Sequence, residues 1–194
     1  MCKPATPSQS NNPVLHRRAF LKAGLALSAS LALPLPSLAS LADKGERERS
    51  LSLHNTHTGE SLQSVVYWAD GDYLPEALTD INHLLRDHRT NTIKPIDPKL
   101  FDLLFALGKK IDSQRPYQII SGYRSPETNR RLRQASSGVA KKSFHLAGRA
   151  ADIRLPGCKL SHLRRAALNL RGGGVGYYPR SNFIHVDTGP LRNW

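Results

Sequence analysis

The sequence predicts an α+β fold, a single domain in which an antiparallel sheet is flanked by helices. Apolar residues alternate with polar ones in several short segments and recur at helical spacing in others. These strand and helix patterns follow one another without a regular strand–helix–strand rhythm, which argues against a parallel α/β sheet. A chain of 194 residues with 39% hydrophobic content suits one globular core.

The first half of the chain predicts a β-hairpin followed by two helices. Residues 50–68 (SLSLHNTHTGESLQSVVYW) alternate around a Thr-Gly turn, which is typical of two paired strands. Leucine and isoleucine recur at helical spacing in residues 75–88 (PEALTDINHLLRDH) and 97–111 (DPKLFDLLFALGKKI), and Pro75 stands where a first helical turn tolerates it. We expect His54 and His57, which flank the hairpin turn, to be surface or turn-capping residues.

The second half of the chain predicts further strands and helices in mixed order. The expected elements are a strand in YQIISGY (117–123), a helix in RSPETNRRLRQ (124–134), a strand in AADIRL (150–155), a helix in LSHLRRAALNL (160–170), a strand in RGGGVGYYP (171–179) and a final strand in SNFIHVDTG (181–189). Ser125 and Pro126 favour a helix start through their capping and fixed-φ preferences. Arg124 therefore lies at a strand-to-helix junction, from which its side chain can reach into a cleft.

We expect the N-terminal segment to be a twin-arginine export signal. Paired arginines in HRRAFLK (16–22) precede an Ala-rich apolar run, as in such signals. Two prolines interrupt this run, so we expect neither a retained transmembrane helix nor a stable membrane anchor. The expected organisation is a signal peptide over residues 1–42, a charged flexible lead over 43–49 and one domain over 50–194, in the periplasm.

The charge and the cysteines agree with an exported protein. The chain carries a net charge of +13, and without residues 1–42 it still has 24 basic residues against 15 acidic ones, a net charge of +9. In a cytoplasmic protein this excess would suggest nucleic acid. For an exported protein we expect no nucleic acid, and the cell wall, lipid headgroups or a generally basic solvated surface account for the charge equally well. Cys158 is the sole cysteine after the signal, and we expect a structural thiol.

One stretch, SFHLAGRAADIRL (143–155), places His145 seven residues before Asp152. Strand alternation puts Asp152 on the polar face of its strand, and in NFIHVDT it puts His185 and Asp187 on one face. If the two strands are neighbours, His145, Asp152 and His185 converge on one point. Two imidazoles and a carboxylate form a ligand set typical of catalytic zinc. On spacing alone, a structural His–Asp hydrogen bond at a strand end is the simpler interpretation.

The flanking residues carry a resemblance that favours zinc. SGYRS (121–125), SFHLAGRAAD (143–152) and FIHVD (183–187) resemble, in this order, the motifs of the zinc D-Ala-D-Ala peptidases and the L,D- or D,D-endopeptidases of the cell wall, the peptidase M15 group with the hedgehog/DD-peptidase fold. The segments LSLHNTHTGE and GGVGYYPRSNFIHVDTG are more similar still to the exported murein endopeptidases of this group. The resemblance extends from about residue 50 to residue 194.

The resemblance implies roles for individual residues. His145, Asp152 and His185 correspond to the zinc ligands. Arg124 corresponds to a residue that binds a substrate carboxylate or carbonyl, for which the two-pronged guanidinium is well suited. Ser143 is expected to orient the loop that carries His145 through a side-chain hydrogen bond.

The general base is the point at which the chain departs from the family pattern. Many relatives place an acidic residue three positions before the last metal histidine, and here this position is Asn182, whose amide cannot accept a proton from water. Asp187, two residues after His185 and on the same strand face, is the candidate substitute. Three roles are open for Asp187: the catalytic base, a hydrogen-bond partner of a metal histidine, or a fourth ligand.

The resemblance therefore implies zinc-dependent hydrolysis of peptide cross-links in peptidoglycan, with the stem peptides as the substrate. The D-Ala to diaminopimelate bond, a D,D bond, is the expected target. The alternatives are a D-Ala-D-Ala carboxypeptidase or dipeptidase, and a non-catalytic peptidoglycan-binding module, which the missing acid at position 182 would favour.

Overall fold

The structure, a computed structural model, describes residues 46–136 and 138–194. The helices are α1 (Pro75–Leu84), α2 (Pro98–Ile111), α3 (Pro126–Ala135) and α4 (Leu160–Leu170), with the short 3₁₀ helices η2 (Phe144–Ala147) and η3 (Pro179–Ser181). The strands are β1 (Glu48–Asn55), β2 (Ser61–Ala69), β3 (Asp72–Tyr73), β4 (Tyr117–Ser121), β5 (Ala150–Arg154), β6 (Gly174–Tyr178), β7 (Phe183–Asp187) and β8 (Arg192–Asn193). The expected signal peptide lies outside the described residues. Of the lead expected over 43–49, the described end already belongs to the sheet, because β1 begins at Glu48.

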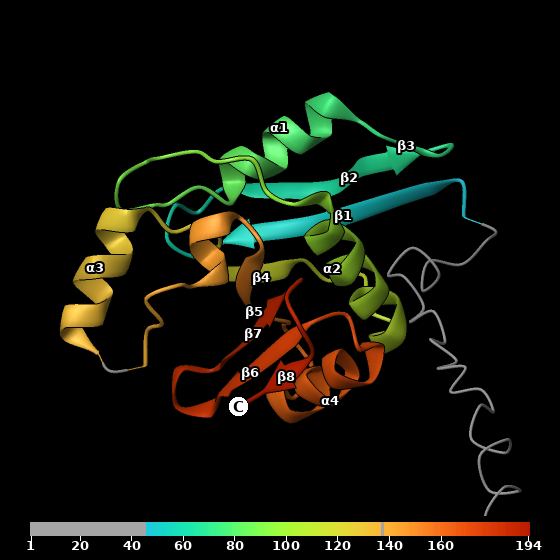
Figure 1. The fold of residues 1–194 in the computed structure, drawn as a ribbon. Helices are drawn as coiled ribbons and strands as arrows, with labels where there is room; N and C mark the ends of the chain where they lie inside the picture. Colours follow the sequence, from blue (N-terminus) through green and yellow to red (C-terminus); the bar gives the residue numbers. More distant parts are fainter. Residues whose placement is uncertain (1–45, 137) are drawn as a thin grey trace, which may run out of the picture. The chain divides into compact units, whose positions relative to one another are not determined.

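The eight strands form one sheet in the order β3-β2-β1-β4-β5-β7-β6-β8 (Figure 1). The α+β class is confirmed, and most neighbouring strands run antiparallel, as predicted. Two pairs differ from the prediction, since β1 and β4 are parallel and so are β6 and β8. The chain passes through α1 and α2 before it forms β4, and this long crossover permits parallel pairing. After β7 the chain reverses once more, so that β8 runs in the direction of β6.

The first predicted helix is shorter than its apolar pattern, because tertiary hydrogen bonds take over at its end. α1 stops at Leu84, although the pattern continues to residue 88. The carbonyl of Leu85 accepts a hydrogen bond from Tyr123 N at 2.7 Å, and Asp87 Oδ2 accepts one from Ser125 N at 2.9 Å. The chain thus leaves the helix to meet the segment that carries Arg124.

The core lies between the sheet and its helices. It occupies one face of β5 and β7, so only the other face of these strands can carry a functional site. α2 packs against β1 and α4, and α4 packs against β6 and β7. Ile153 of β5 and Ile184 of β7 are fully buried in this core. Asp152 and His185 are the next residues to these isoleucines along their strands. Because successive side chains of a strand point to opposite faces, Asp152 and His185 point away from the core, to the other face of the sheet.

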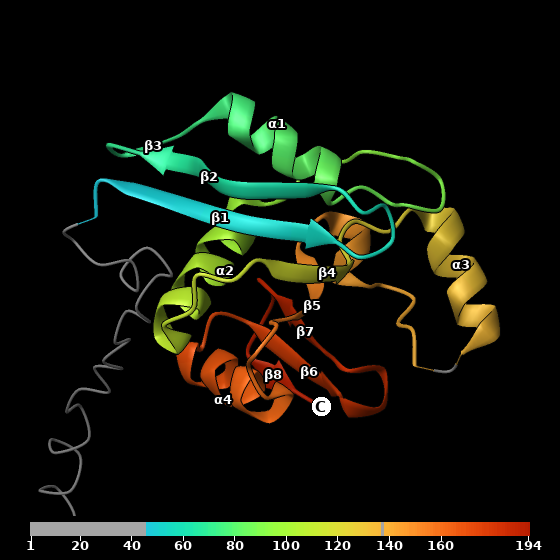
Figure 2. The ribbon, with the colours of Figure 1, turned by 180° about the vertical axis from the view of Figure 1, so that it is seen from behind.

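Helix α3 stands to one side of the sheet, apart from α2 and α4, in both views (Figures 1 and 2). No helix of the described residues is long and apolar enough to cross a membrane.

Candidate metal centre

Two neighbouring strands and one short helix place the histidines and the aspartate side by side. β5 pairs with β7 in a register that sets Asp152 directly opposite His185. His145 lies in η2, just before β5, and Ser143 caps this helix by accepting a hydrogen bond from His145 N at 3.4 Å. Gly148 ends η2 with a φ of +67°, and a Cβ there would lie 2.6 Å from the carbonyl oxygen of Pro95. A glycine is therefore needed for the turn that folds His145 back over Asp152.

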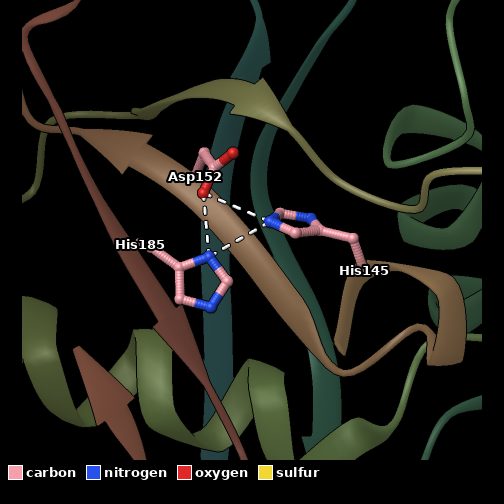
Figure 3. A group of neighbouring side chains, drawn as sticks. All are labelled: His145, Asp152 and His185. Atoms are coloured by element: carbon pink, nitrogen blue, oxygen red, sulfur yellow. Dashed lines mark hydrogen bonds and ion pairs between the residues drawn. The ribbon is translucent and has the colours of Figure 1, made fainter. Parts of the chain in front are cut away.

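The three side chains converge on one point (Figure 3). Asp152 Oδ1 lies 3.2 Å from His145 Nε2 and 3.0 Å from His185 Nδ1, and these two nitrogens are 3.1 Å apart. All three residues are buried, with exposed fractions of 2, 6 and 7% for His145, Asp152 and His185. Among the described residues, they are the one group of histidine, cysteine and acidic side chains arranged to hold a metal ion.

Hydrogen bonds on the far side of each imidazole hold both rings in this orientation. His145 Nδ1 lies 2.7 Å from the carbonyl oxygen of Gly122, and His185 Nε2 lies 2.8 Å from Asp187 Oδ2. Because a carbonyl and a carboxylate can only accept, the protons belong on these outer nitrogens. The lone pairs of His145 Nε2 and His185 Nδ1 then face Asp152 Oδ1. Three acceptors at this separation repel one another unless a proton or a metal ion lies among them.

The donor set fits zinc in its chemistry. Two nitrogens and one carboxylate oxygen are the protein ligands of many catalytic zinc sites, and ordered outer hydrogen bonds of this kind are their usual support. Burial lowers the pKa of His145 and keeps its ring neutral, as a metal ligand must be. Burial alone would raise the pKa of Asp152, but the two histidines outweigh it and hold that pKa well below its usual range. Burial likewise opposes protonation of His185, yet the carboxylates of Asp152 and Asp187 raise its pKa, so a metal ion that binds Nδ1 takes the place of a proton there.

Asp187 lies behind His185, away from the point of convergence. It is fully buried, and its Oδ1 accepts hydrogen bonds from the backbone N–H groups of Gly174 at 3.2 Å and Gly189 at 2.8 Å. Arg192 contacts both of its oxygens, at 3.1 and 2.6 Å. Burial would raise the pKa of Asp187, but the bonds from His185 and Arg192 hold that pKa well below its usual range. Of the three open roles, this geometry favours the hydrogen-bond partner of a metal histidine.

Arg124 reaches the centre from the segment between β4 and α3. Its exposed fraction is 9%, and its guanidinium lies 3.4 Å from Asp152 Oδ2 and 3.5 Å from Ser121 Oγ. The buried Nε has no hydrogen-bond partner among the described residues. Burial lowers the pKa of this guanidinium. Arg124 thus places its guanidinium at the wall of the cleft beside Asp152, where a guanidinium can bind an oxygen of a substrate.

A cleft of about 720 Å³ opens onto the centre. His145, Asp152, His185, Arg124 and Ser143 line it, so it brings together all the predicted site residues except Asp187. In the part of the chain that the structure describes, Asp152 is the only acidic residue of the lining, whereas Arg124, Lys142 and Arg192 are basic. Asn182 is exposed and takes no part in the lining.

Three residues of the cleft were missed by sequence reasoning: Phe144, Arg192 and Trp194. Phe144 directly precedes His145, and this neighbourhood was a signal that could have been used. Trp194 and Arg192 follow the last predicted strand, and no sequence pattern shows that they return to the centre.

The histidines of the hairpin turn belong to other contacts, as expected. His54 Nδ1 lies 2.8 Å from Ser61 Oγ, and the ring of His57 stacks on that of His88 with 3.9 Å between centroids. Cys158 is half-buried, and burial raises its thiol pKa, which fits an unreactive thiol.

Comparison with known proteins assigns the chain to a family. Residues 43–194 match a peptidase M15 family model described as "Peptidoglycan L,D-endopeptidase MepK". The protein of that name from Escherichia coli (strain K12) is 50% identical over 178 residues, which cover 92% of this chain and 96% of the relative. "Probable peptidoglycan L,D-endopeptidase MepK" of Haemophilus influenzae is 42% identical over 172 residues, 88% of this chain and 90% of the relative.

Proposed function

Since the chain belongs to the peptidoglycan L,D-endopeptidase MepK family of the peptidase M15 group, we propose that it is a zinc-dependent endopeptidase that hydrolyses peptide cross-links of peptidoglycan. The observation that carries this proposal is the convergence of His145, Asp152 and His185 at the floor of a basic cleft. From the resemblance alone, a D,D bond is the expected target. The relatives are named for an L,D bond, and we propose that bond for this chain as well.

His145, Asp152 and His185 would hold the zinc ion through Nε2, Oδ1 and Nδ1. When bound, zinc polarises a carbonyl group and lowers the pKa of water to about 7. Gly122 and Asp187 keep the two imidazoles in the ligating tautomer, and Arg124 directs its free guanidinium donors at a carbonyl or carboxylate oxygen of the stem peptide. The basic lining attracts stem peptides, which carry free carboxylates, and the buried floor limits access of bulk water.

The test is incubation of the purified zinc-loaded protein with peptidoglycan sacculi, followed by chromatography of the muropeptides. We expect cross-linked dimers to decrease and monomers to increase, and a chelator to stop the reaction. Separate assays on L,D- and D,D-cross-linked dimers decide the bond. Unchanged dimers in the presence of stoichiometric zinc would support a binding module, and release of free D-Ala with dimers intact would support a carboxypeptidase.

Arg124 provides a prediction about substrate binding. Arg124→Lys keeps the charge but loses the two-pronged geometry, so we expect kcat/KM on cross-linked dimers to fall about 10- to 100-fold, the equivalent of one or two charged hydrogen bonds. Zinc content, measured by mass spectrometry, should stay stoichiometric. Arg130→Lys on the exposed side of α3 is the matched control, and an unchanged kcat/KM in Arg124→Lys would exclude the role.

We further propose that residues 1–42 are a twin-arginine signal and that the protein works in the periplasm, where peptidoglycan lies. The family match begins at residue 43, where the mature chain would start. Changing Arg17 and Arg18 to lysine is expected to leave the precursor in the cytoplasm, as measured by cell fractionation. The same change at the adjacent pair Arg130 and Arg131 is the control. Normal export of the first variant would indicate the general secretory route.

A further inference from the structure

Trp194 is an exposed aromatic residue in the wall of the cleft. Four large hydrophobic side chains are exposed in the described part of the chain: Tyr73, Ile93, Leu191 and Trp194. Trp194, with an exposed fraction of 47%, is the one of these four that lines the cleft. Exposure of a large apolar ring to water is unfavourable, and a ligand that covers the ring gains the free energy of burying that surface.

The backbone and the ring nitrogen of Trp194 are both held in place. Next to β8, its N–H donates to the carbonyl of Val175 at 3.3 Å, and its carbonyl accepts from Tyr177 N at 3.0 Å. The indole Nε1–H donates to the hydroxyl of Tyr178 at 2.8 Å. The ring is therefore oriented before a ligand arrives, and binding against it requires little ordering of the side chain.

Strand β6 lies beneath the indole ring of Trp194 and provides the space that the ring occupies next to the metal centre. Gly176 of β6 lies directly opposite His185 of β7. A Cβ on Gly176 would lie 2.7 to 2.8 Å from three atoms of the indole, so the ring occupies the space in which a side chain would otherwise stand. Its centroid is 5.3 Å from that of His185, with 47° between the planes.

A stacked arginine supports the ring on another side. The guanidinium of Arg192 lies 5.1 Å from the centroid of Trp194 and 4.8 Å from that of Phe144, while its ion pair with Asp187 fixes it. The same aspartate accepts the hydrogen bond from His185, so the ring and the metal histidine share one supporting group.

We infer that Trp194 contacts the substrate. Its exposed indole surface packs against an apolar part of the cross-link, the methylene chain of the diamino acid, beside the bond that is cut. This inference rests on the proposed function. The carboxylates of a stem peptide suit Arg124 and Lys142, whereas its aliphatic chain needs an apolar wall, and an aromatic ring buries a large area at small cost in conformational entropy. Trp194 would thus set the position of the cross-link relative to His185.

The direct test uses tryptophan fluorescence. The chain has two tryptophans, and Trp68 on β2 takes no part in the lining of the cleft. In zinc-loaded Trp68→Phe protein, Trp194 is the only such emitter. We expect its emission to change saturably on titration with a sugar-free cross-linked peptide whose scissile amide is reduced to a methylene-amine. Calorimetry on the same samples measures binding independently.

A kinetic test accompanies it. Trp194→Ala is expected to raise KM for cross-linked dimers about 10-fold, with a smaller change in kcat and unchanged zinc content, while Trp194→Phe recovers most of the loss because it keeps a ring. An unchanged KM at saturating zinc, with weakened zinc binding, would overturn the inference and make Trp194 a mere support of His185.

The outcomes of the titration separate the two proposals. If the unaltered protein cuts dimers and calorimetry detects the peptide, but the emission of Trp194 does not change, the inference fails and the function stands. If the emission responds only to fragments that carry sugar, the ring contacts the glycan and the inference is overturned. If neither cleavage nor binding of the peptide is detected, the proposed function itself fails.

Discussion

Replacing His145 or His185 by alanine is expected to remove zinc from the purified protein and to lower peptidoglycan hydrolysis by at least about 10³-fold. Each change deletes one of three protein ligands, and the transition-state stabilisation that the metal contributes, several kcal/mol, is lost with it. Elemental analysis by mass spectrometry and muropeptide chromatography measure the two effects.

The fold should survive these changes, because the core lies on the other side of the sheet. Ile153 and Ile184, the neighbours of the centre in β5 and β7, point into the core and are untouched. Far-ultraviolet circular dichroism should therefore be unchanged. His162→Ala on the exposed side of α4 is the matched control. A His145 or His185 variant that keeps stoichiometric zinc would refute the ligand assignment.

The second large effect is expected for Asp187→Asn. The change keeps the shape of the side chain but removes the charge that orients His185 and pairs with Arg192. We expect zinc affinity to fall about 10- to 100-fold, as for other outer-shell partners of metal histidines, and activity to recover in excess zinc. The free energy of unfolding should fall by about 1 to 3 kcal/mol, because a hydrogen-bonded charge is lost from a buried site.

The same variant separates the remaining roles of Asp187. If the variant retains zinc at limiting metal and its turnover falls about 10²- to 10⁴-fold without recovery, Asp187 is the general base. Zinc affinity and turnover that both match the unaltered protein would exclude every role considered for it. Asp80→Asn on the exposed side of α1 is the control, since it makes the same chemical change away from the centre.

Much of the fold follows from local patterns that tertiary contacts do not override. The hairpin of β1 and β2, the helix α2 and the helix start at Ser125 agree with the predictions, since period-two alternation, helical leucine spacing and capping preferences act within a few residues. Residues 85–88 show the limit of such reasoning. Leu85 continues the helical spacing of the apolar residues, but its carbonyl accepts a hydrogen bond from Tyr123 N and the N–H of Asp87 donates to the carbonyl of Thr92, so the backbone leaves the helix.

Two of the three residues of the candidate centre, Asp152 and His185, were predictable because their places depend on strand alternation and on one strand pairing, whereas His145 reaches them from η2 through the turn at Gly148. Asp152 and His185 each stand on the polar side of a strand whose other side is apolar, and this is visible in AADIRL and FIHVD. The prediction assumed that the strands of Asp152 and His185 are neighbours, and the structure confirms that β5 pairs with β7.

By itself, the sequence determined the period of the main strands and helices, the chemistry of the three converging side chains and the family. Only the tertiary structure decided that β8 returns beside β6, that Trp194 lies over Gly176 next to His185, and that Asp187 faces Arg192 and two backbone amides and not the cleft. The physical reason is that alternation assigns a side chain to a face of the sheet, whereas the atoms that meet it there come from segments whose place depends on long-range strand pairing, which no local pattern encodes.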